Sequence, residues 1–131
     1  MNVPKSAILV IDDDDMVRDS LKALLESRDF VVTDFESGRQ FLQQADGVTA
    51  QCLLLDVHMP DMSGPDLLKI LRDSGNAIPA ILITGRRDAA TEERARELGV
   101  VAVLDKPVRH ATLFAAIEQA LDTSRVPPAS T

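Results

Sequence analysis

The sequence is poor in residues that mark several classes of protein. It has a single cysteine, Cys52, so an internal disulfide is excluded, in agreement with a reducing compartment. It has no tryptophan or tyrosine and only four phenylalanines, which is too few for a platform that stacks nucleic-acid bases. A net charge of −7 would repel a phosphate backbone. We therefore expect no nucleic-acid binding by this chain itself.

Long apolar segments are also missing. No apolar run approaches the length of a membrane-spanning helix, and the N-terminus lacks the basic start and apolar core of a signal peptide. We therefore expect no membrane partner and a cytoplasmic location. The length of 131 residues fits one domain, and 45% apolar residues are enough for a buried core.

Short apolar runs alternate with segments of helical period along the chain. The runs are continuously apolar, which is typical of strands buried on both faces of a parallel sheet. They cover residues 7–11, 30–32, 52–57, 80–83 and 100–104. The helical segments cover 15–28, a short stretch after 37, 65–72, 88–98 and 110–121.

This alternation predicts an α/β fold. We expect a (βα)5 domain over residues 1–122, with a doubly wound five-stranded parallel sheet, helices on both faces and right-handed crossovers. The polar, proline-containing segment 123–131 is expected to be a flexible C-terminal tail or the start of a linker.

Reactive side chains follow four of the five expected strands. In a doubly wound sheet, ligands bind beyond the carboxyl ends of the strands. In chain order these ends carry Asp12 and Asp13, Asp56, Thr84 and Lys106. The second expected strand leads to nothing reactive, which an edge position would explain. We therefore expect carboxylates, a hydroxyl and an ammonium to converge on one edge of the sheet.

The acidic side chains predict a site for a divalent cation. Two carboxylates about 4 Å apart repel by roughly 4 kcal/mol at an effective dielectric near 20, so Asp12, Asp13 and Asp56 would raise one another's pKa or recruit a cation. An all-oxygen site with room for water suits Mg2+. Zinc is disfavoured because Cys52 should point into the core and the two histidines lie far apart in sequence.

Asp56 interrupts an apolar strand, where an unpaired carboxylate is costly. A carboxylate can attack phosphorus and form an acyl phosphate, while a divalent ion neutralises the repulsion and Lys106 balances the remaining charge. Thr84 would donate its hydroxyl to a phosphate oxygen. The alternatives are structural roles: Asp56 as a satisfied core acid, Thr84 bonded to a nearby backbone group, and Lys106 as a solvated strand end.

The same residues carry a family resemblance. The segments IDDDDMVRDSL, LLLDVHMPDMSG, LITG and LDKPV occur in this order over about residues 6–122 and resemble the receiver domain of two-component response regulators. The first of them and DVHMPDMSG look especially like FixJ-type receivers. The resemblance implies the flavodoxin-like strand order 2-1-3-4-5 and phosphorelay signal transduction. Asp56 would accept a phosphoryl group from a sensor histidine kinase or a histidine phosphotransfer protein, and Thr84 and Lys106 would contact its oxygens.

The resemblance also implies a set of metal ligands. Asp13 and Asp56 would bind Mg2+ directly, together with the backbone carbonyl of His58, and Asp12 would act mainly through water. The chain would then be no enzyme in the usual sense. It would be a phosphoacceptor switch that assists its own phosphoryl transfer and dephosphorylation.

Three positions depart from the family pattern or vary within it. Three residues before the lysine, the family usually places an aromatic side chain that swings inward as the threonine moves, whereas this chain has Val103. Because a small branched side chain cannot make that rotation, we expect activation to act more through the loop after Thr84 and the helix starting near Asp88. His58 and Arg86 occupy positions that tune the phosphate lifetime in the family.

Two surfaces are candidates for partner binding. Four arginines add positive charge near the fourth expected helix: Arg86, Arg87, Arg94 and Arg96. They form either a solvated helical face or an interface, such as a homodimer through the fourth and fifth helices. Met16, with Pro107 and Val108, is a candidate docking patch for a kinase.

The acidic run and the other reactive residues leave two alternative interpretations. Residues 13–17 fit the D-x-D-x-[TV] pattern of haloacid-dehalogenase-like phosphatases, but that interpretation makes Asp13 the nucleophile, leaves Asp56 unexplained and finds no acidic metal pair after the lysine. A non-phosphorylated interaction module that keeps only the fold is a second alternative, against which the intact site chemistry argues. Nucleotide-binding glycine motifs and the glycine and distal glutamate of an EF-hand are absent from the sequence.

Overall fold

The computed structural model describes residues 6–44 and 48–125, the last three by their backbone alone. Within these ranges, strands and helices alternate strictly. The strands are β1 (Ala7–Ile11), β2 (Val31–Phe35), β3 (Cys52–Asp56), β4 (Ala80–Thr84) and β5 (Ala102–Asp105). The helices are α1 (Asp15–Glu26), α2 (Gly38–Gln44), α3 (Gly64–Asp73), α4 (Ala89–Leu98) and α5 (His110–Arg125). Among the described residues, none of these helices has both the length and the apolar character needed to cross a bilayer.

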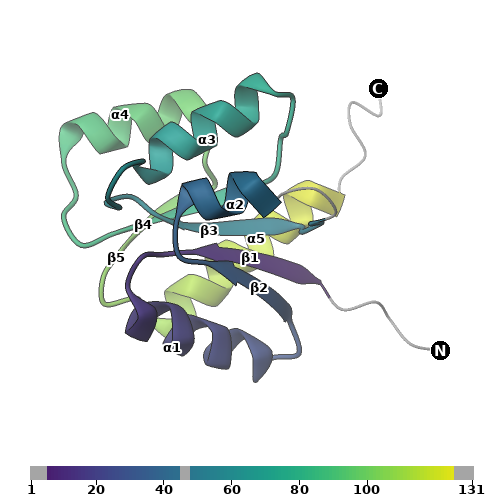
Figure 1. Cartoon of the computed structure of the whole chain (residues 1–131). Coiled ribbons are helices and arrows are strands. Elements are labelled where there is room, and N and C mark those ends of the chain that lie inside the picture. The colour runs from purple at the N-terminus through teal and green to yellow at the C-terminus, as the bar shows by residue number, and fades with distance from the viewer. Residues whose placement is uncertain (1–5, 45–47, 126–131) are drawn as a thin grey trace.

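The strands form one parallel sheet in the order β2-β1-β3-β4-β5 (Figure 1). The predicted (βα)5 fold and its flavodoxin-like strand order are therefore confirmed. The register pairs Asp56 with Ile83, and Thr84 with Asp105. Because all strands run the same way, the residues that follow them lie along a single edge of the sheet.

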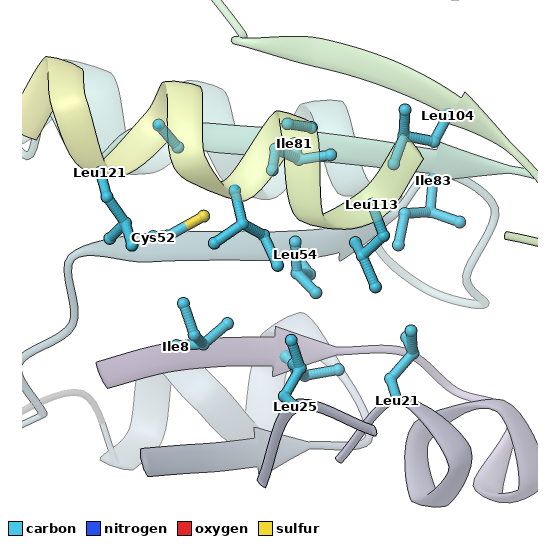
Figure 2. Packing of buried hydrophobic residues seen from close by; sticks show 14 residues of the cluster. Ile8, Leu21, Leu25, Cys52, Leu54, Ile81, Ile83, Leu104, Leu113 and Leu121 are labelled. Atoms are coloured by element: carbon cyan, nitrogen blue, oxygen red, sulfur yellow. The ribbon is translucent and has the colours of Figure 1, made fainter. Parts of the chain in front are cut away.

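Helices cover both faces of the sheet and bury two separate apolar clusters. Helices α1 and α5 pack on one face, where Figure 2 shows Leu25 of α1 and Leu113 of α5 meeting Ile8, Leu54 and Ile81 of the strands. Helices α2, α3 and α4 cover the other face. Burial on both faces explains why β1, β3 and β4 are apolar at nearly every position rather than at alternate ones.

The helix ends carry recognisable signals. The carboxylate of Asp14 accepts the first free backbone N–H groups of α1, Ser63 does the same for α3, and Asp88 for α4. Pro65 lies in the first turn of α3, where the missing N–H costs nothing. Gly99 ends α4 in the left-handed conformation, with φ of 69°.

Two element boundaries differ from the prediction by three or more residues, and several others differ by one or two. The second strand was expected at 30–32 but runs over Val31–Phe35, because its pairing with β1 continues beyond the apolar residues through Asp34. The last helix was expected to end at 121 but continues to Arg125. The expected tail over 123–131 therefore begins inside a helix, and its residues 126–131 lie outside the described part of the chain. The domain boundary at 122 stays a prediction.

Candidate functional site

Three aspartates gather at the carboxyl ends of β1 and β3. Asp12 and Asp13 directly follow β1, and Asp56 is the last residue of β3. One carboxylate oxygen from each lies within 4.8 Å of the other two. Asp12 and Asp56 are only 1% and 3% exposed, whereas Asp13 faces solvent. The structure thus brings together the three acidic side chains that were predicted to share a cation.

Lys106 follows β5 and reaches into this acidic cluster. Its Nζ lies 3.3 Å from Oδ2 of Asp12 and 3.3 Å from Oδ1 of Asp56. Its backbone N–H donates to the carbonyl oxygen of Thr84 at 2.8 Å, and the peptide bond to Pro107 is cis. The interpretation of Lys106 as a solvated strand end is therefore wrong.

One buried oxygen of the cluster has no hydrogen bond. Oδ1 of Asp12 accepts the backbone N–H of Asp14 at 2.9 Å, but Oδ2 accepts no hydrogen bond from any residue that the structure describes. Its contact with Lys106 is close enough for an ion pair, without the alignment that a hydrogen bond requires. A buried carboxylate oxygen in this state is available to a ligand.

The electrostatics of the cluster are unbalanced. Burial raises the pKa of Asp56 from its ordinary 3.8 to about 7, helped by the charge of Asp12 and a hydrogen bond with Asp13 and opposed by Lys106. Burial lowers the pKa of Lys106, but the two buried carboxylates outweigh that effect and leave it raised. The ammonium is therefore charged at neutral pH, and a single positive charge is too little for the carboxylates around it.

The donor set fits Mg2+. All three aspartates offer oxygen, the exposure of Asp13 leaves room for water in the coordination shell, and a divalent charge would relieve the repulsion between the carboxylates. The side chain of His58 is exposed, with Nε2 lying 3.4 Å from the carbonyl oxygen of Arg86. The role of the His58 carbonyl as a further ligand stays a prediction.

Thr84 is completely buried at the end of β4, and its hydroxyl is engaged with its own loop. The hydroxyl donates to the carbonyl oxygen of Arg86 at 2.8 Å and accepts the backbone N–H of Arg86 at 3.1 Å. The backbone interaction considered for Thr84 is therefore present. To donate to a phosphoryl oxygen, the hydroxyl has to leave the Arg86 carbonyl.

Gly64 closes the loop between β3 and α3 directly behind Asp56. Its N–H donates to the carbonyl oxygen of Val57 at 2.9 Å, and a Cβ atom at this position would lie 2.3 Å from the carbonyl oxygen of Asp56. The sequence indicated a turn here but not this close approach. The only signal in the sequence was a glycine placed immediately before Pro65.

The sequence-based prediction did not find the contacts of two arginines near the site: it did not single out Arg18, and it named Arg87 only as part of a positively charged helix region. Arg18 of α1 contacts the backbone of Asp12, and Arg87 links the loop after β4 to β5. For Arg18, a signal was present in its spacing of three residues from Asp15 on a helix. For Arg87 there was none, because its partner Asp105 lies on a different strand.

Comparison with known proteins identifies the family. Residues 8–118 match the family model described as response regulator receiver domain. This chain belongs to that family. The receiver is 39% identical over 117 residues to the transcriptional regulatory protein FixJ of Bradyrhizobium diazoefficiens, a match that covers 89% of the chain and 57% of FixJ. It is 37% identical over 121 residues to the response regulator protein TmoT of Ectopseudomonas mendocina, covering 92% and 55%.

The chain spans little more than half the length of these curated relatives. Among solved structures, the crystal structure of FixJ-N superposes with a TM-score of 0.83 at 35% identity, covering 92% of this chain and 96% of that one. Full-length FixJ from B. japonicum gives 0.85 at 38% identity, covering 98% and 62%. The receiver is therefore FixJ-like, and the family predicted from the sequence is confirmed. It is a signalling switch of two-component phosphorelays with a phosphoacceptor aspartate, which argues against the phosphatase interpretation.

Proposed function

We propose that Asp56 is the phosphoacceptor of this receiver. It is buried at the end of the central strand β3, with Nζ of Lys106 at 3.3 Å from its carboxylate. This pairing is the observation that carries the proposal. Asp12 is a poorer candidate because one of its oxygens already accepts the N–H of Asp14, and Asp13 faces solvent.

The phosphoryl group comes from a phosphohistidine of a sensor histidine kinase or a histidine phosphotransfer protein. A carboxylate oxygen of Asp56 attacks phosphorus, and the bond between phosphorus and the histidine nitrogen breaks, so that the nitrogen keeps the electron pair. The ammonium of Lys106 is held ready beside the acceptor oxygen, where it balances negative charge on the transferred group. In a separate hydrolysis step, water attacks phosphorus and the bond between phosphorus and the Asp56 oxygen breaks. Inorganic phosphate leaves and the Asp56 carboxylate is restored, so the receiver assists its own dephosphorylation.

Asp13 and Asp56 would hold Mg2+, together with the carbonyl of His58, and Asp12 would act through water. When bound, the cation would neutralise the charge shared by the acceptor carboxylate and the phosphoryl oxygens. The buried, unpartnered Oδ2 of Asp12 supports this assignment. So does the raised pKa of Asp56, because burial and neighbouring carboxylates disfavour its charged form until a cation is present.

The phosphorylated state is transmitted through the loop after Thr84 rather than through residue 103. When the Thr84 hydroxyl turns to a phosphoryl oxygen, it gives up the carbonyl of Arg86 and thereby frees the loop. Val103 is half-buried against the apolar cluster under α2, α3 and α4. Its carbonyl oxygen accepts a hydrogen bond from Arg87 at 2.7 Å, so the moving loop is tied to β5 by the arginine.

Helix α4 is the element that responds. It buries only Thr91 and Ala95, whereas α3 on the same face buries three leucines. A helix with so little buried apolar surface moves at low cost. Movement of α4 would change the face formed by α4 and α5, and we propose this face as the contact for a second copy of the receiver.

The kinase docks on a groove between α1 and the loop after β5. Its lining includes Met16 and Leu24 of α1 together with Pro107 and Val108, and it borders Lys106. The side chain of Met16 is 81% exposed, which is unusual for a large apolar residue. An apolar surface beside the acceptor brings the donor histidine close to Asp56.

The proposal is tested by incubating the chain with acetyl phosphate and Mg2+ and measuring its intact mass. The wild type gains one phosphoryl group, and Asp56→Asn gains none. Asp61→Asn is a matched control, because Asp61 is exposed in the same loop and asparagine tolerates its φ of 70°. Equal phosphorylation of Asp56→Asn and the wild type would contradict the proposal.

A further inference from the structure

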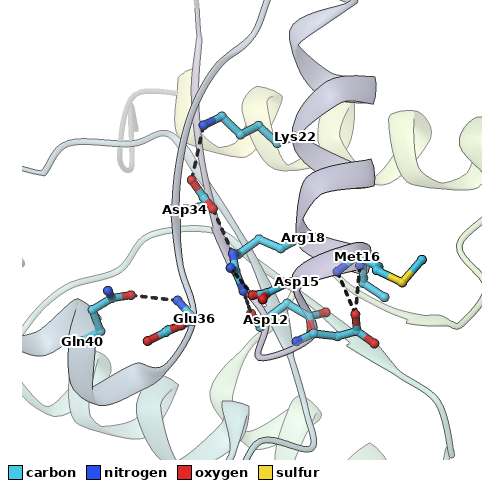
Figure 3. A network of polar contacts seen from close by, with 10 residues as sticks. Asp12, Asp15, Met16, Arg18, Lys22, Asp34, Glu36 and Gln40 are labelled. Carbon is cyan, nitrogen blue, oxygen red and sulfur yellow. Dashed lines mark hydrogen bonds and ion pairs between the residues drawn. The ribbon is translucent and has the colours of Figure 1, made fainter.

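Arg18 is a largely buried cation that lies against the loop after β1, which carries Asp12 and Asp13. Its side chain is 12% exposed and donates to acceptors from three parts of the chain (Figure 3). Nη1 donates to the backbone carbonyl of Asp12 at 2.7 Å, Nε to Oδ2 of Asp34 at 2.9 Å, and Nη2 to Oδ1 of Asp15 at 2.5 Å. The planar guanidinium suits this arrangement because its donors leave in fixed, diverging directions.

These contacts complete the restraint of Asp12. Its N–H donates to the carbonyl oxygen of Phe35 at 3.2 Å, its carbonyl accepts from Arg18, and its Oδ1 accepts the N–H of Asp14. The only polar atom of Asp12 left without a hydrogen bond among the described residues is Oδ2, which faces Lys106. The three hydrogen bonds of Asp12 therefore set the direction of Oδ2, and the one from Arg18 is the shortest of them.

The second strand does carry an acid, Asp34, but its carboxylate pairs with cations of α1 and does not join the acidic cluster. Asp34 lies near the end of the edge strand β2 and is 25% exposed. Its two carboxylate oxygens lie 2.9 Å from Nε of Arg18 and 3.5 Å from Nζ of Lys22. Asp34 thus points at α1 rather than at the cation site, and it holds the guanidinium against the loop.

We propose that Arg18, held by Asp34, is a positioning residue that sets the loop after β1 so that Asp12 and Asp13 meet Mg2+. The inference rests on the proposed function, since it concerns the same cation site. Arg18 touches neither the phosphoryl group nor the cation and acts through the backbone of Asp12. Mutation of groups that orient metal ligands typically costs about 10- to 100-fold in metal affinity.

The test is calorimetric titration of the full chain with Mg2+ alone. Arg18→Met removes the guanidinium at similar length, and Arg18→Lys keeps the charge but cannot donate in three fixed directions at once. Both variants bind Mg2+ about tenfold more weakly than the wild type. Arg39→Met is the matched control, because Arg39 is exposed on α2, and its affinity stays unchanged.

A second readout separates positioning from general stability. At temperatures where circular dichroism shows every variant folded, the Arg18 variants need about tenfold more Mg2+ for half-maximal phosphorylation by acetyl phosphate, but they reach the wild-type maximal rate. A purely structural role leaves this Mg2+ requirement unchanged.

Asp34→Asn provides an independent arm if the Arg18 variants do not fold, because it keeps Arg18 and removes the charge that holds it. We expect weaker Mg2+ binding in the same direction. Wild-type Mg2+ affinity in the folded Arg18 variants, or in Asp34→Asn where those do not fold, would overturn the inference. Failure of the wild type itself to bind Mg2+ or accept phosphate would instead contradict the proposed function, so the two failures are distinguishable.

Discussion

The Nζ atom of Lys106 lies 3.3 Å from Oδ1 of Asp56. The two residues belong to the ends of β5 and β3, which are separated by β4 in the sheet, so the contact exists only at the carboxyl edge of the folded sheet. Because Asp12 lies equally close to the same ammonium, one positive charge serves two buried carboxylates. The remaining negative charge supports the proposal that a divalent cation binds before Asp56 accepts a phosphoryl group.

Replacing Lys106 with methionine should slow phosphorylation. The variant loses the ammonium that balances charge at the acceptor, and removal of one such group typically costs about 100-fold in rate. The measurement is the initial rate of mass gain with acetyl phosphate and Mg2+. Lys69→Met is a suitable control, because Lys69 is exposed on α3 and pairs with Asp73, away from the acidic cluster. A rate in Lys106→Met equal to that of the control would contradict a role in the transfer.

Binding of Mg2+ should strengthen as the pH rises through 7. The pKa of Asp56 is about 7 in the metal-free protein, so below that pH the cation has to displace a proton from the carboxyl group. Calorimetric titrations below and above pH 7 measure the change in affinity and the protons released. In Asp56→Asn this pH dependence around 7 disappears. Equal affinities on both sides of pH 7 would show that Asp56 is already ionised without the metal.

Asp56→Asn should stabilise the metal-free chain at neutral pH. The folded state binds the Asp56 proton more tightly than the unfolded state does, so stability is lost as the pH rises from 3.8 to about 7 and the buried group ionises. The asparagine variant avoids this loss and gains roughly 2–4 kcal/mol in free energy of unfolding above pH 7. Urea denaturation of both proteins at pH values below and above this range gives the difference. A stability difference that does not grow with pH would contradict the raised pKa.

Gly64→Ala should destabilise the fold. The added Cβ would lie 2.3 Å from the carbonyl oxygen of Asp56, so the loop after β3 has to move, at a cost of about 2–4 kcal/mol. Gly85→Ala is the matched control, because no described residue other than its chain neighbours has a heavy atom within 4 Å of a Cβ there, and we expect a change below about 0.5 kcal/mol. Urea denaturation measures both. Equal stabilities would mean that the loop accepts a side chain behind the acceptor.

Arg87→Met should loosen the loop after β4 even in the unphosphorylated protein. Its guanidinium donates to the Val103 carbonyl and pairs with Asp105 and Glu92, and these contacts connect the loop, α4 and β5. Hydrogen exchange of residues 85–92 should increase in this variant. It should also increase in the phosphorylated wild type, where the Thr84 hydroxyl releases the Arg86 carbonyl. Arg96→Met, at an exposed position on α4, serves as the control. Changes confined to residues 56–64 on phosphorylation would contradict transmission through this loop.

The sequence was sufficient for the alternation of elements and for the residues at the edge of the sheet. Continuous apolar runs imply buried parallel strands, and parallel strands place Asp12, Asp56 and Lys106 at one edge whatever the details of packing. The contacts of Arg18 with Asp34 were not predictable, because they depend on side-chain conformations across two elements. The orientation of the Thr84 hydroxyl was not predictable either, because the carbonyl of Arg86 and a ligand compete for the same proton.

The most direct test of the central claim is to locate the phosphoryl group chemically. Borohydride reduces an aspartyl phosphate to homoserine, so the phosphorylated chain can be reduced, digested and sequenced by mass spectrometry. The account predicts homoserine at position 56, formed only when Mg2+ and a phosphodonor are both present. Homoserine at position 12 or 13, or phosphorylation that proceeds equally well without the cation, would contradict it.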